Sequence, residues 1–385
     1  MLHTKVVDTP LIAYQTFHDD PLRVLRVIRF AVRYNMTLSE DIIMACKHPR
    51  IHDELRRKVS RERVGKELEG MLSGKHANPI KAMDLICAMN LGDSVFYLPS
   101  NTDLIGTVGQ QGLKPVIYTL QQETSSRIRD CAWDETRRCL KVLSFLLDEL
   151  NIQRSNVGSL TIPMINDKDA SGTTTSATAP SVAIITPVDS RLVYLAVFLL
   201  PYSKLLYIDK KQRTKNVVEY MIQEGIKFKN KDVQCLSLVI GTLDDMTQLL
   251  QQTANITRLQ IGLLLRAARG MWTTVLIVAT VSLLRSERDR LWCARAKEVY
   301  ETIVVKMNLD ECWKTKPLMN GKSLIQALDL DRGPQVGVYM EEQVKWILIN
   351  PTGTIEELQS FLKAFKYTRE SKDVSIEPVS KKAHR

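Results

Sequence analysis

A short stretch near the start of the chain combines acidic and basic side chains at spacings that suit chemistry. Four arginines recur there every three or four positions, on a segment that Pro21 favours as the start of a helix: Arg23, Arg26, Arg29 and Arg33. Residues three or four apart lie on one face of a helix, so the four guanidinium groups form one basic stripe. Such a stripe is either a solvated surface or a binding site for an anion.

Asp20 and Arg23 give this stripe a more specific chemistry. They are three residues apart, which places a carboxylate acceptor beside a planar donor fork, the pairing needed to read the Watson–Crick edge of a base. The stripe also holds more positive charge than Asp19 and Asp20 can neutralise, which leaves some for a triphosphate. The segment is therefore a candidate nucleotide-binding helix, with an ordinary charged surface as the alternative.

The composition predicts an all-α fold and favours a polyanionic partner. The 385 residues are 44% hydrophobic and 6% aromatic, a balance that favours helices over a β-sandwich or barrel. The 53 Lys and Arg residues exceed the 43 Asp and Glu residues, giving a net charge of +10 that suits a nucleic acid. Seven cysteines without a C-x-x-C pair indicate intracellular thiols rather than a zinc site. The apolar stretches 192–200 and 275–284 are shorter than the roughly 20 residues that span a bilayer, so no membrane partner is expected.

Apolar periodicity and capping residues place helices along most of the chain. The predicted helices cover 19–34, 39–47, 127–150, 190–207, 212–224, 244–252, 257–269, 271–284 and 286–307. Others are predicted to start after the N-cap residues Ser60 and Asn78, after Gly321, and at the capping box Thr354-x-x-Glu357, with one more ending near Leu348. Residues 155–181 are rich in Ser, Thr, Gly and Ala and are predicted to be a disordered insertion.

Three motifs resemble those of one enzyme family. Residues 19–23, Asp-Asp-Pro-Leu-Arg, followed by Val24-Leu25-Arg26-x-x-Arg29-Phe30, resemble the fourth motif of class II tRNA nucleotidyltransferases, the CCA-adding enzymes of bacteria and eukaryotes. Residues 60–67, Ser-Arg-Glu-Arg-Val-Gly-Lys-Glu, are similar to the next motif of that family. Residues 316–322, Lys-Pro-Leu-Met-Asn-Gly-Lys, with Gly333-Pro334, resemble its tail. The resemblance implies a helical neck, body and tail.

The resemblance also implies roles for individual residues. Asp20 and Arg23 match the pair that reads the incoming base, and Arg26 would lie toward the triphosphate. Asp19 stands where bacterial relatives usually have Glu. The motif at 60–67 is expected mainly to brace the selecting helix. Asp19, Arg29, Arg61 and Arg63 are the candidates for supporting or phosphate contacts.

The domain boundaries follow from these motifs and from the insertion. We expect a remnant of a catalytic head at 1–18, nucleotide-selecting and neck helices at 19–92, a body at 93–154 and 182–307, a tail at 308–369 and a frayed end at 370–385. Two groups of basic residues in the body suit nucleic-acid phosphates, with ordinary helix surface as the alternative. They are Lys204, Lys210, Lys211, Arg213 and Lys215, and, interleaved with Trp292, Arg285, Arg288, Arg290 and Arg295.

The catalytic head of the family is not expected within this sequence. In the family it precedes the selecting helix and holds two magnesium ions on an Asp-x-Asp pair, whereas eighteen residues precede Asp19 here. The two Asp-x-Asp strings of the chain, Asp167/Asp169 and Asp329/Asp331, do not follow a Gly-rich strand and are not predicted to bind a catalytic metal. We therefore predict no catalytic residue and no metal site in this chain, with Mg²⁺ bound only together with the head.

The function that the resemblance implies is addition of CCA to the 3' end of tRNA. The chain would supply nucleotide selection and tRNA binding but not catalysis alone, with tRNA, CTP and ATP as partners and no DNA. One alternative is an active transferase whose head comes from another chain or an upstream segment. Another is a helical protein-interaction scaffold derived from the family. The cytoplasm is the expected compartment, with the nucleus, mitochondrion or plastid as alternatives if a targeting segment lies upstream.

Overall fold

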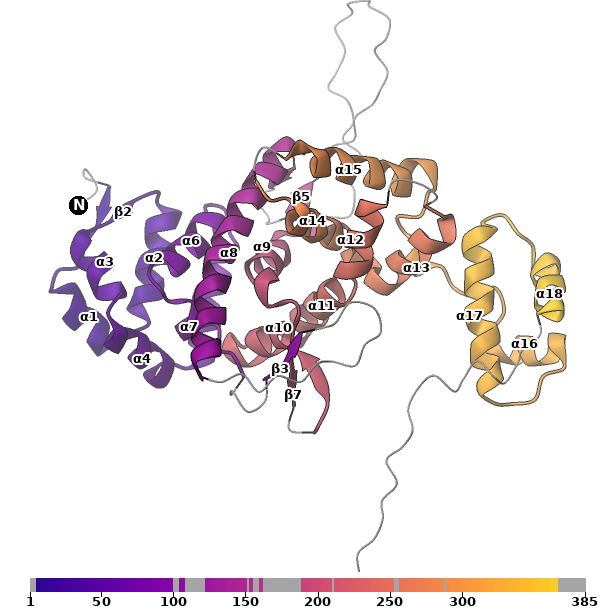
Figure 1. Cartoon of the computed structure of the whole chain (residues 1–385), viewed down its shortest axis with the longest axis horizontal. Coiled ribbons are helices and arrows are strands. Elements are labelled where there is room, and N and C mark those ends of the chain that lie inside the picture. Colours follow the sequence, from indigo (N-terminus) through magenta and orange to yellow (C-terminus); the bar gives the residue numbers. More distant parts are fainter. Residues whose placement is uncertain are drawn as a thin grey trace, which may run out of the picture.

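The computed structural model describes residues 5–99, 104–107, 122–150, 152–154, 159–161, 188–209, 211–252, 256–286 and 289–365, and most of these residues are helical. Figure 1 shows the helices following one another along the long axis of the molecule, with α1–α7 at one end and α16–α18 at the other. We call these the N-terminal and C-terminal helices, and α8–α15 the central helices.

The N-terminal helices are short and begin at local capping signals. They are α1 (Ala13–Asp19), α2 (Arg23–Arg33), α3 (Glu40–Cys46), α4 (Pro49–Lys58), α5 (Arg61–Leu72), α6 (Pro79–Ala88) and α7 (Gly92–Val95). The side chain of Ser39 accepts a hydrogen bond from the backbone N–H of Ile42 and caps α3, and Asn78 caps α6 in the same way. Ser60 is the N-cap residue of α5, as predicted, but its side chain makes no capping hydrogen bond.

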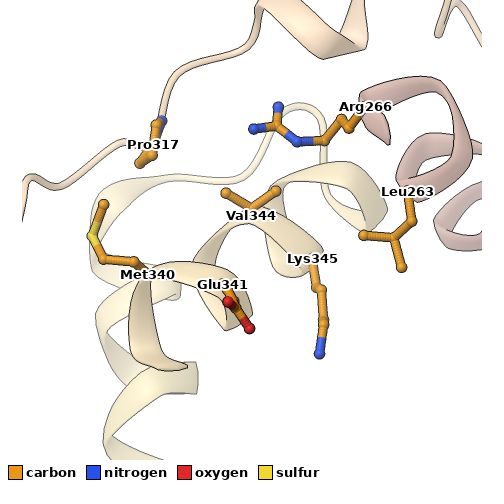
Figure 2. Close-up of a pocket in the computed structure, with 7 residues that line it drawn as sticks. All are labelled: Leu263, Arg266, Pro317, Met340, Glu341, Val344 and Lys345. Carbon is orange, nitrogen blue, oxygen red and sulfur yellow. The ribbon is translucent and has the colours of Figure 1, made fainter. Parts of the chain in front are cut away.

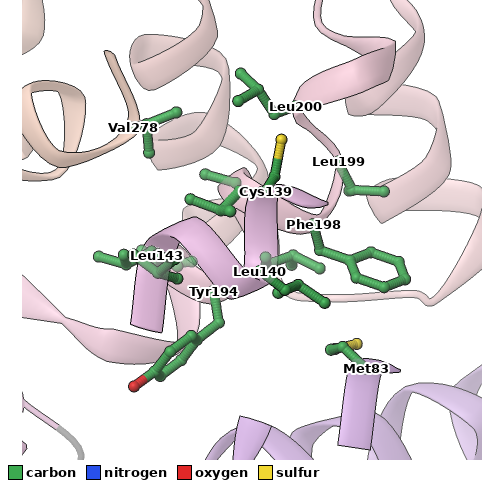
Figure 3. Packing of buried hydrophobic residues seen from close by; sticks show 14 of the residues in the cluster. Met83, Cys139, Leu140, Leu143, Tyr194, Phe198, Leu199, Leu200 and Val278 are labelled. Atoms are coloured by element: carbon green, nitrogen blue, oxygen red, sulfur yellow. The ribbon is translucent and has the colours of Figure 1, made fainter. Parts of the chain in front are cut away.

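The central helices surround a fully buried apolar core. They are α8 (Gln122–Glu149), α9 (Ser190–Phe198), α10 (Val217–Tyr220), α11 (Asn230–Gly241), α12 (Leu243–Gln251), α13 (Arg258–Ala268), α14 (Trp272–Leu283) and α15 (Arg290–Glu301). Figure 3 shows Leu140 and Leu143 of α8 packed with Phe198 of α9 and Val278 of α14. The same core continues into the N-terminal helices, so both groups fold around one apolar interior.

Short irregular helices and small sheets join these elements. The irregular helices are η1 (Leu200–Tyr202), η2 (Met221–Gly225), η3 (Arg269–Met271), η4 (Thr302–Lys306) and η5 (Cys312–Lys314). Strands β1 (Val6–Val7) and β2 (Thr37–Leu38) pair in parallel. Two antiparallel sheets contain β3 (Leu104–Thr107), β7 (Leu205–Ile208) and β8 (Thr214–Asn216), and β4 (Gln153–Arg154), β5 (Ser159–Thr161) and β6 (Val188–Asp189).

The C-terminal helices have a separate small core. They are α16 (Gly321–Leu328), α17 (Pro334–Ile349) and α18 (Ile355–Ala364), and α18 begins at the predicted capping box of Thr354 and Glu357. The buried side chain of Gln343 holds the preceding loop, because it accepts from the backbone N–H of Met319 at 2.6 Å and donates to its carbonyl O at 3.0 Å. The loop before α16 is thereby fixed to α17.

The sequence-based expectations fail where strands replace predicted helices. The predicted helix over 190–207 ends at Phe198, and strand β7 follows it. The predicted helix over 212–224 begins as strand β8. Within the predicted disordered insertion, Ser159–Thr161 forms β5 and pairs with both its neighbours, while the rest of 155–181 lies outside the described residues. The fold is therefore mainly helical, with small sheets that the all-α prediction lacked.

One helical run tests the prediction that no segment can span a membrane. The 26 residues Arg258–Leu283 have a mean hydropathy of 1.4 in their most apolar window and are long enough to cross a bilayer. However, 67% of that window is buried by the rest of the protein, as in an ordinary core helix. The run is also divided at Arg269, whose φ of 53° separates α13 from α14. Its length and composition are therefore explained by packing inside the protein.

Candidate functional site

The residues predicted to read a base meet at the start of α2. Asp20 lies in the turn between α1 and α2, and its Oδ1 accepts a hydrogen bond from the backbone N–H of Leu22 at 3.3 Å. Its Oδ2 lies 3.5 Å from Nη2 of Arg63 on α5, and these two side chains are 28% and 50% exposed. The carboxylate thus pairs loosely with Arg63 rather than with Arg23. The predicted side-by-side pair of Asp20 and Arg23 does not form an ion pair in this structure.

Arg23 and Arg26 present their guanidinium groups to solvent. Arg23 is exposed, and its hydrogen bond among the described residues is a long one, 3.4 Å from Nη1 to the carbonyl O of Thr16. Arg26 is 48% exposed, and its Nε lies 4.0 Å from Glu67. Asp19, at the end of α1, is also exposed. Donors and acceptors for a nucleotide are therefore available around the start of α2.

The other half of the arginine stripe holds two helices together. Nε of Arg29 donates to Glu67 of α5 at 2.6 Å, and the two side chains are only 16% and 14% exposed. Nη2 of Arg33 donates to the carbonyl O of Gly70 at 3.0 Å. The four arginines therefore do not act as one binding surface. Arg29, predicted as a supporting or phosphate contact, is a brace between α2 and α5.

The guanidinium of Arg61 also makes contacts within the protein instead of being free to bind a phosphate. Its Nε donates to the carbonyl O of Gly225 at 2.6 Å, Nη1 donates to that of Ser94 at 3.1 Å, and Nη2 donates to that of Val95. The guanidinium carbon lies 3.9 Å from the centre of the Tyr97 ring. Burial lowers the pKa of Arg61, although the nearby Tyr97 acts in the opposite direction. With all three nitrogens engaged, Arg61 makes supporting contacts, one of the two roles predicted for it, and is not placed to bind a phosphate.

A charged cluster that the sequence analysis missed fixes the end of α1. Glu54 of α4 lies 2.8 Å from Nδ1 of His18, 3.3 Å from Lys58 and 3.5 Å from Arg50. Burial raises the pKa of Glu54, but hydrogen bonds and charge from His18 and Lys58 outweigh it and leave the pKa below its usual value. His18 directly precedes Asp19, so this cluster anchors the chain where the candidate site begins.

The two basic clusters predicted in the body are largely paired within the protein. Lys204 pairs with Asp244, Arg213 with Asp209 at 2.7 Å, and Lys215 with Glu219 at 2.8 Å. Arg295 donates to the carbonyl groups of Leu250 and Gln252, and Arg290 lies 3.7 Å from Glu149. Lys210 and Arg288 lie outside the described residues. Most of the cations in these clusters that the structure describes therefore serve local structure.

The geometry of the Asp-x-Asp strings and thiols gives no metal ligand set in the part of the chain that is described. Asp329 ends α16 in the left-handed conformation, with φ 49°, and Asp167 and Asp169 lie outside the described residues. Among the described residues, no three or more His, Cys, Asp or Glu side chains come together as a metal site would require. Burial raises the pKa of Cys46, Cys87 and Cys139 to about 12, which keeps these thiols protonated and unreactive.

One cavity among the described residues lies far from α2. It has a volume of about 420 Å³ and lies between α13 and α17. Figure 2 shows its lining, which consists of the apolar Leu263, Pro317, Met340 and Val344 with the charged Arg266, Glu341 and Lys345. Figure 1 places α2 and α17 at opposite ends of the molecule. The cavity is therefore not part of the candidate nucleotide site.

Comparison with known proteins relates the chain to tRNA nucleotidyltransferases. No protein-family model matches it. It is 26% identical over 374 residues to the mitochondrial CCA tRNA nucleotidyltransferase of Saccharomyces cerevisiae, covering 93% of this chain and 62% of that protein. It is 24% identical over 366 residues to the tRNA nucleotidyltransferase cca1 of Schizosaccharomyces pombe, covering 92% of this chain and 63% of that protein. The chain thus spans less than two thirds of the length of these curated relatives.

Solved structures give matches of the same kind at lower identity. A Thermotoga maritima CCA-adding enzyme complexed with tRNA matches with a TM-score of 0.47 and 15% identity, over 94% of this chain and 65% of that one. A Bacillus stearothermophilus CCA-adding enzyme in complex with CTP matches with the same score and identity, over 94% and 66%. The curated relatives bear out the resemblance to CCA tRNA nucleotidyltransferases that the motifs carry.

Gly65 tests how closely α5 approaches the central helices. A Cβ added at Gly65 would lie 2.1 Å from the carbonyl O of Ile226, so Gly65→Ala forces the two backbones apart. We expect a loss of about 1–3 kcal/mol in the free energy of unfolding, measured by urea denaturation. The control is Gly241→Ala at the end of α11, where a Cβ meets nothing within 4 Å. Equal stability of the two variants would contradict the close approach.

The lowered pKa of Glu54 predicts that its contribution to the stability of the fold is lost in acid. Its lowered pKa means that the folded state gains from the ionised carboxylate above the ordinary pKa of 4.5, and loses that gain as the pH falls through the folded value. Glu54→Gln should therefore be less stable than the unmodified protein at pH 6, with the difference shrinking toward pH 3. Thermal unfolding across this range measures it. Glu40→Gln, at an exposed position of α3, is the control and should show no such trend.

Proposed function

We propose that this chain selects the nucleotide and binds the RNA when CCA is added to the 3' end of tRNA. The support is the similarity to curated CCA tRNA nucleotidyltransferases over 92–95% of the chain, combined with the partly exposed Asp20 and the exposed Arg23 at the start of α2. The observation that carries the proposal is that neither side chain is consumed by a mutual ion pair.

The Watson–Crick edges of cytosine and adenine match a site with one hydrogen-bond acceptor beside one donor. Cytosine and adenine each present an amino donor next to a ring-nitrogen acceptor on the Watson–Crick edge, whereas uracil and guanine present a carbonyl acceptor next to an N–H donor. An ionised Asp20 accepts from the amino group, and the Arg23 guanidinium donates to the ring nitrogen. With uracil or guanine, Asp20 would face a carbonyl acceptor and Arg23 would face an N–H donor, so neither hydrogen bond could form. The pair can therefore accept CTP and ATP and reject UTP and GTP without a nucleic-acid template.

The remaining exposed charge suits the triphosphate. Arg26 lies three residues after Arg23 on the same helix face, half-exposed and only distantly paired with Glu67. A guanidinium in that position can donate to phosphate oxygens while Arg23 contacts the base. Arg63, also half-exposed, can move between Asp20 and solvent. In this proposal the transfer step and its Mg²⁺ belong to a catalytic head, and no residue described here is given a catalytic role.

The proposal also covers the partner and the compartment. The net charge of +10 favours tRNA, and the similar proteins of Saccharomyces cerevisiae and Schizosaccharomyces pombe are named as acting on it. The sequence favours the cytoplasm, but two of the similar proteins are named as mitochondrial. The mitochondrion is therefore the alternative compartment to test.

Separate Asp20→Ala and Arg23→Ala variants test base reading directly. We expect the unmodified chain to bind CTP and ATP more tightly than UTP and GTP, and each variant to lose about 1–3 kcal/mol of that discrimination, because a site built for polar pairing leaves groups unpaired with the wrong base. Equilibrium titration with the four nucleotides measures it. Arg57→Ala, exposed on α4, is the control. If the two residues are only surface charges, the variants will change stability by about 0–1 kcal/mol and discrimination not at all.

Binding of tRNA should survive without catalysis and should depend on salt. Each phosphate that a cation neutralises releases counterions, so the affinity of the purified chain for tRNA should fall steeply between low and physiological salt. The same preparation should not incorporate labelled CMP or AMP. Titration of tRNA and of an unrelated DNA duplex at several salt concentrations measures the affinity for each nucleic acid and its dependence on salt. Equal affinity for the two nucleic acids would indicate nonspecific attraction and would contradict the proposal.

A further inference from the structure

Helix α5 carries two rows of contacts on two different faces. Arg61, Gly65 and Glu69 are spaced four residues apart and therefore lie along one face of the helix. Arg63, Glu67 and Gly70 follow at intervals of four and three residues and lie along another. We call these the central row and the α2 row, after the elements that they contact.

The central row fastens α5 to the central helices along its length. At its start, Arg61 donates to the carbonyl O of Gly225 at the end of η2. At Gly65, the backbone of α5 lies directly against the carbonyl O of Ile226. Near its end, Glu69 accepts at 2.7 Å from Arg191, at the start of α9.

Arg191 is itself firmly placed. It lies 2.7 Å from Asp189 and 3.4 Å from Asp232 of α11, besides its contact with Glu69. Its side chain is 21% exposed. The hydrogen bonds that Arg191 donates to the Asp189 carboxylate are the main cause that raises the pKa of Arg191, with Glu69 adding to it, so the guanidinium stays charged. The end of α5 is therefore tied to two central helices through one guanidinium.

The α2 row connects the same helix to the candidate site. Arg63 lies 3.5 Å from Asp20, Glu67 accepts from Arg29 at 2.6 Å, and the carbonyl O of Gly70 accepts from Arg33 at 3.0 Å. Residue numbers rise together on both helices, so α2 and α5 run in the same direction. A displacement of α5 along its axis would therefore move all three contacts, including that to Asp20.

We propose that the central row of α5 positions Asp20 and Arg23 and thereby sets how well the chain discriminates between nucleotides. The inference rests on the proposed function. Discrimination by hydrogen bonds requires acceptor and donor to be held within about half an ångström of their productive positions. Asp20 is 28% exposed and only loosely paired, so the helices beneath it must supply that precision. Arg61 is the central positioning residue, because its planar fork fixes the rotation of α5 against three backbone carbonyls, which lysine cannot reproduce.

A merely structural role of the central row predicts a different result. If the row only holds the fold together, a variant lowers the folded fraction and weakens the binding of every nucleotide by the same factor. The ratio of CTP affinity to UTP affinity then stays constant. A positioning role changes this ratio, because a shift of the hydrogen-bonding atoms weakens the matched base more than the mismatched one. The ratio therefore separates the two roles.

The experiment compares two variants of the central row with matched controls on neither row. Arg61→Lys and Glu69→Gln test the two ends of the row, and Glu69→Gln carries the test if Arg61→Lys does not fold. Arg57→Lys and Glu62→Gln make the same chemical changes at exposed positions of α4 and α5. Each protein is titrated with CTP and with UTP at a temperature where circular dichroism shows it to be folded.

We expect the CTP-to-UTP ratio to fall about three- to tenfold in both variants of the central row and to stay unchanged in both controls. A normal ratio in folded Arg61→Lys and Glu69→Gln would overturn the inference while leaving the proposed function intact. An equal affinity of the unmodified chain for CTP and UTP would overturn the proposed function, and the inference with it. The two failures are therefore distinguishable in one set of titrations.

Discussion

The contact between Arg29 and Glu67 is the interaction on which the candidate site depends. Both side chains are largely buried, their atoms are 2.6 Å apart, and they join α2, which begins at Arg23 shortly after Asp20, to α5. Removing one partner of a buried ion pair costs about 3–5 kcal/mol, because the other charge is left unpaired. The pair therefore specifies how α2 lies on α5, while the apolar residues of α2 supply the bulk of the packing.

Some arginines of the two motif-like segments are exposed and others are held in structural contacts. Their spacing in the sequence could not reveal which are which. Arg23, Arg26 and Arg29 recur every three residues, yet Arg29 donates a hydrogen bond to the largely buried Glu67 at 2.6 Å, whereas the exposed Arg26 lies 4.0 Å from it. Arg61 resembles a phosphate contact in sequence, but its acceptor Gly225 lies 164 residues further along the chain. Backbone carbonyls also leave no signature in the sequence, because every residue has one. The positions of the candidate residues could thus be predicted, but not which cations would be free.

The same distinction between local and distant causes explains which parts of the fold were predictable. The starts of α3, α6 and α18 depend on Ser39, Asn78 and Thr354, whose side chains bond to backbone groups within three residues. Strands β7 and β8 instead form where apolar periodicity had indicated helices, because each gains backbone partners from the other and β7 also from β3. Helix α11 was not among the predicted helices, because its apolar core face comes without a capping side chain that would mark its start.

The loose contact between Asp20 and Arg63 has a consequence for how a base could bind. If Asp20 were paired tightly with Arg23, an incoming base would have to break that pair before either partner could read it. In this structure the acceptor Oδ2 of Asp20 faces a half-exposed guanidinium at 3.5 Å, while Oδ1 is engaged with the backbone of Leu22. When the amino group of a base replaces Arg63 beside Asp20, the guanidinium of Arg63 returns to water. The exposed ion pair that is lost contributes only about 0–1 kcal/mol. The carboxylate is thus oriented by its backbone bond and by α5, yet remains available to a nucleotide at little cost.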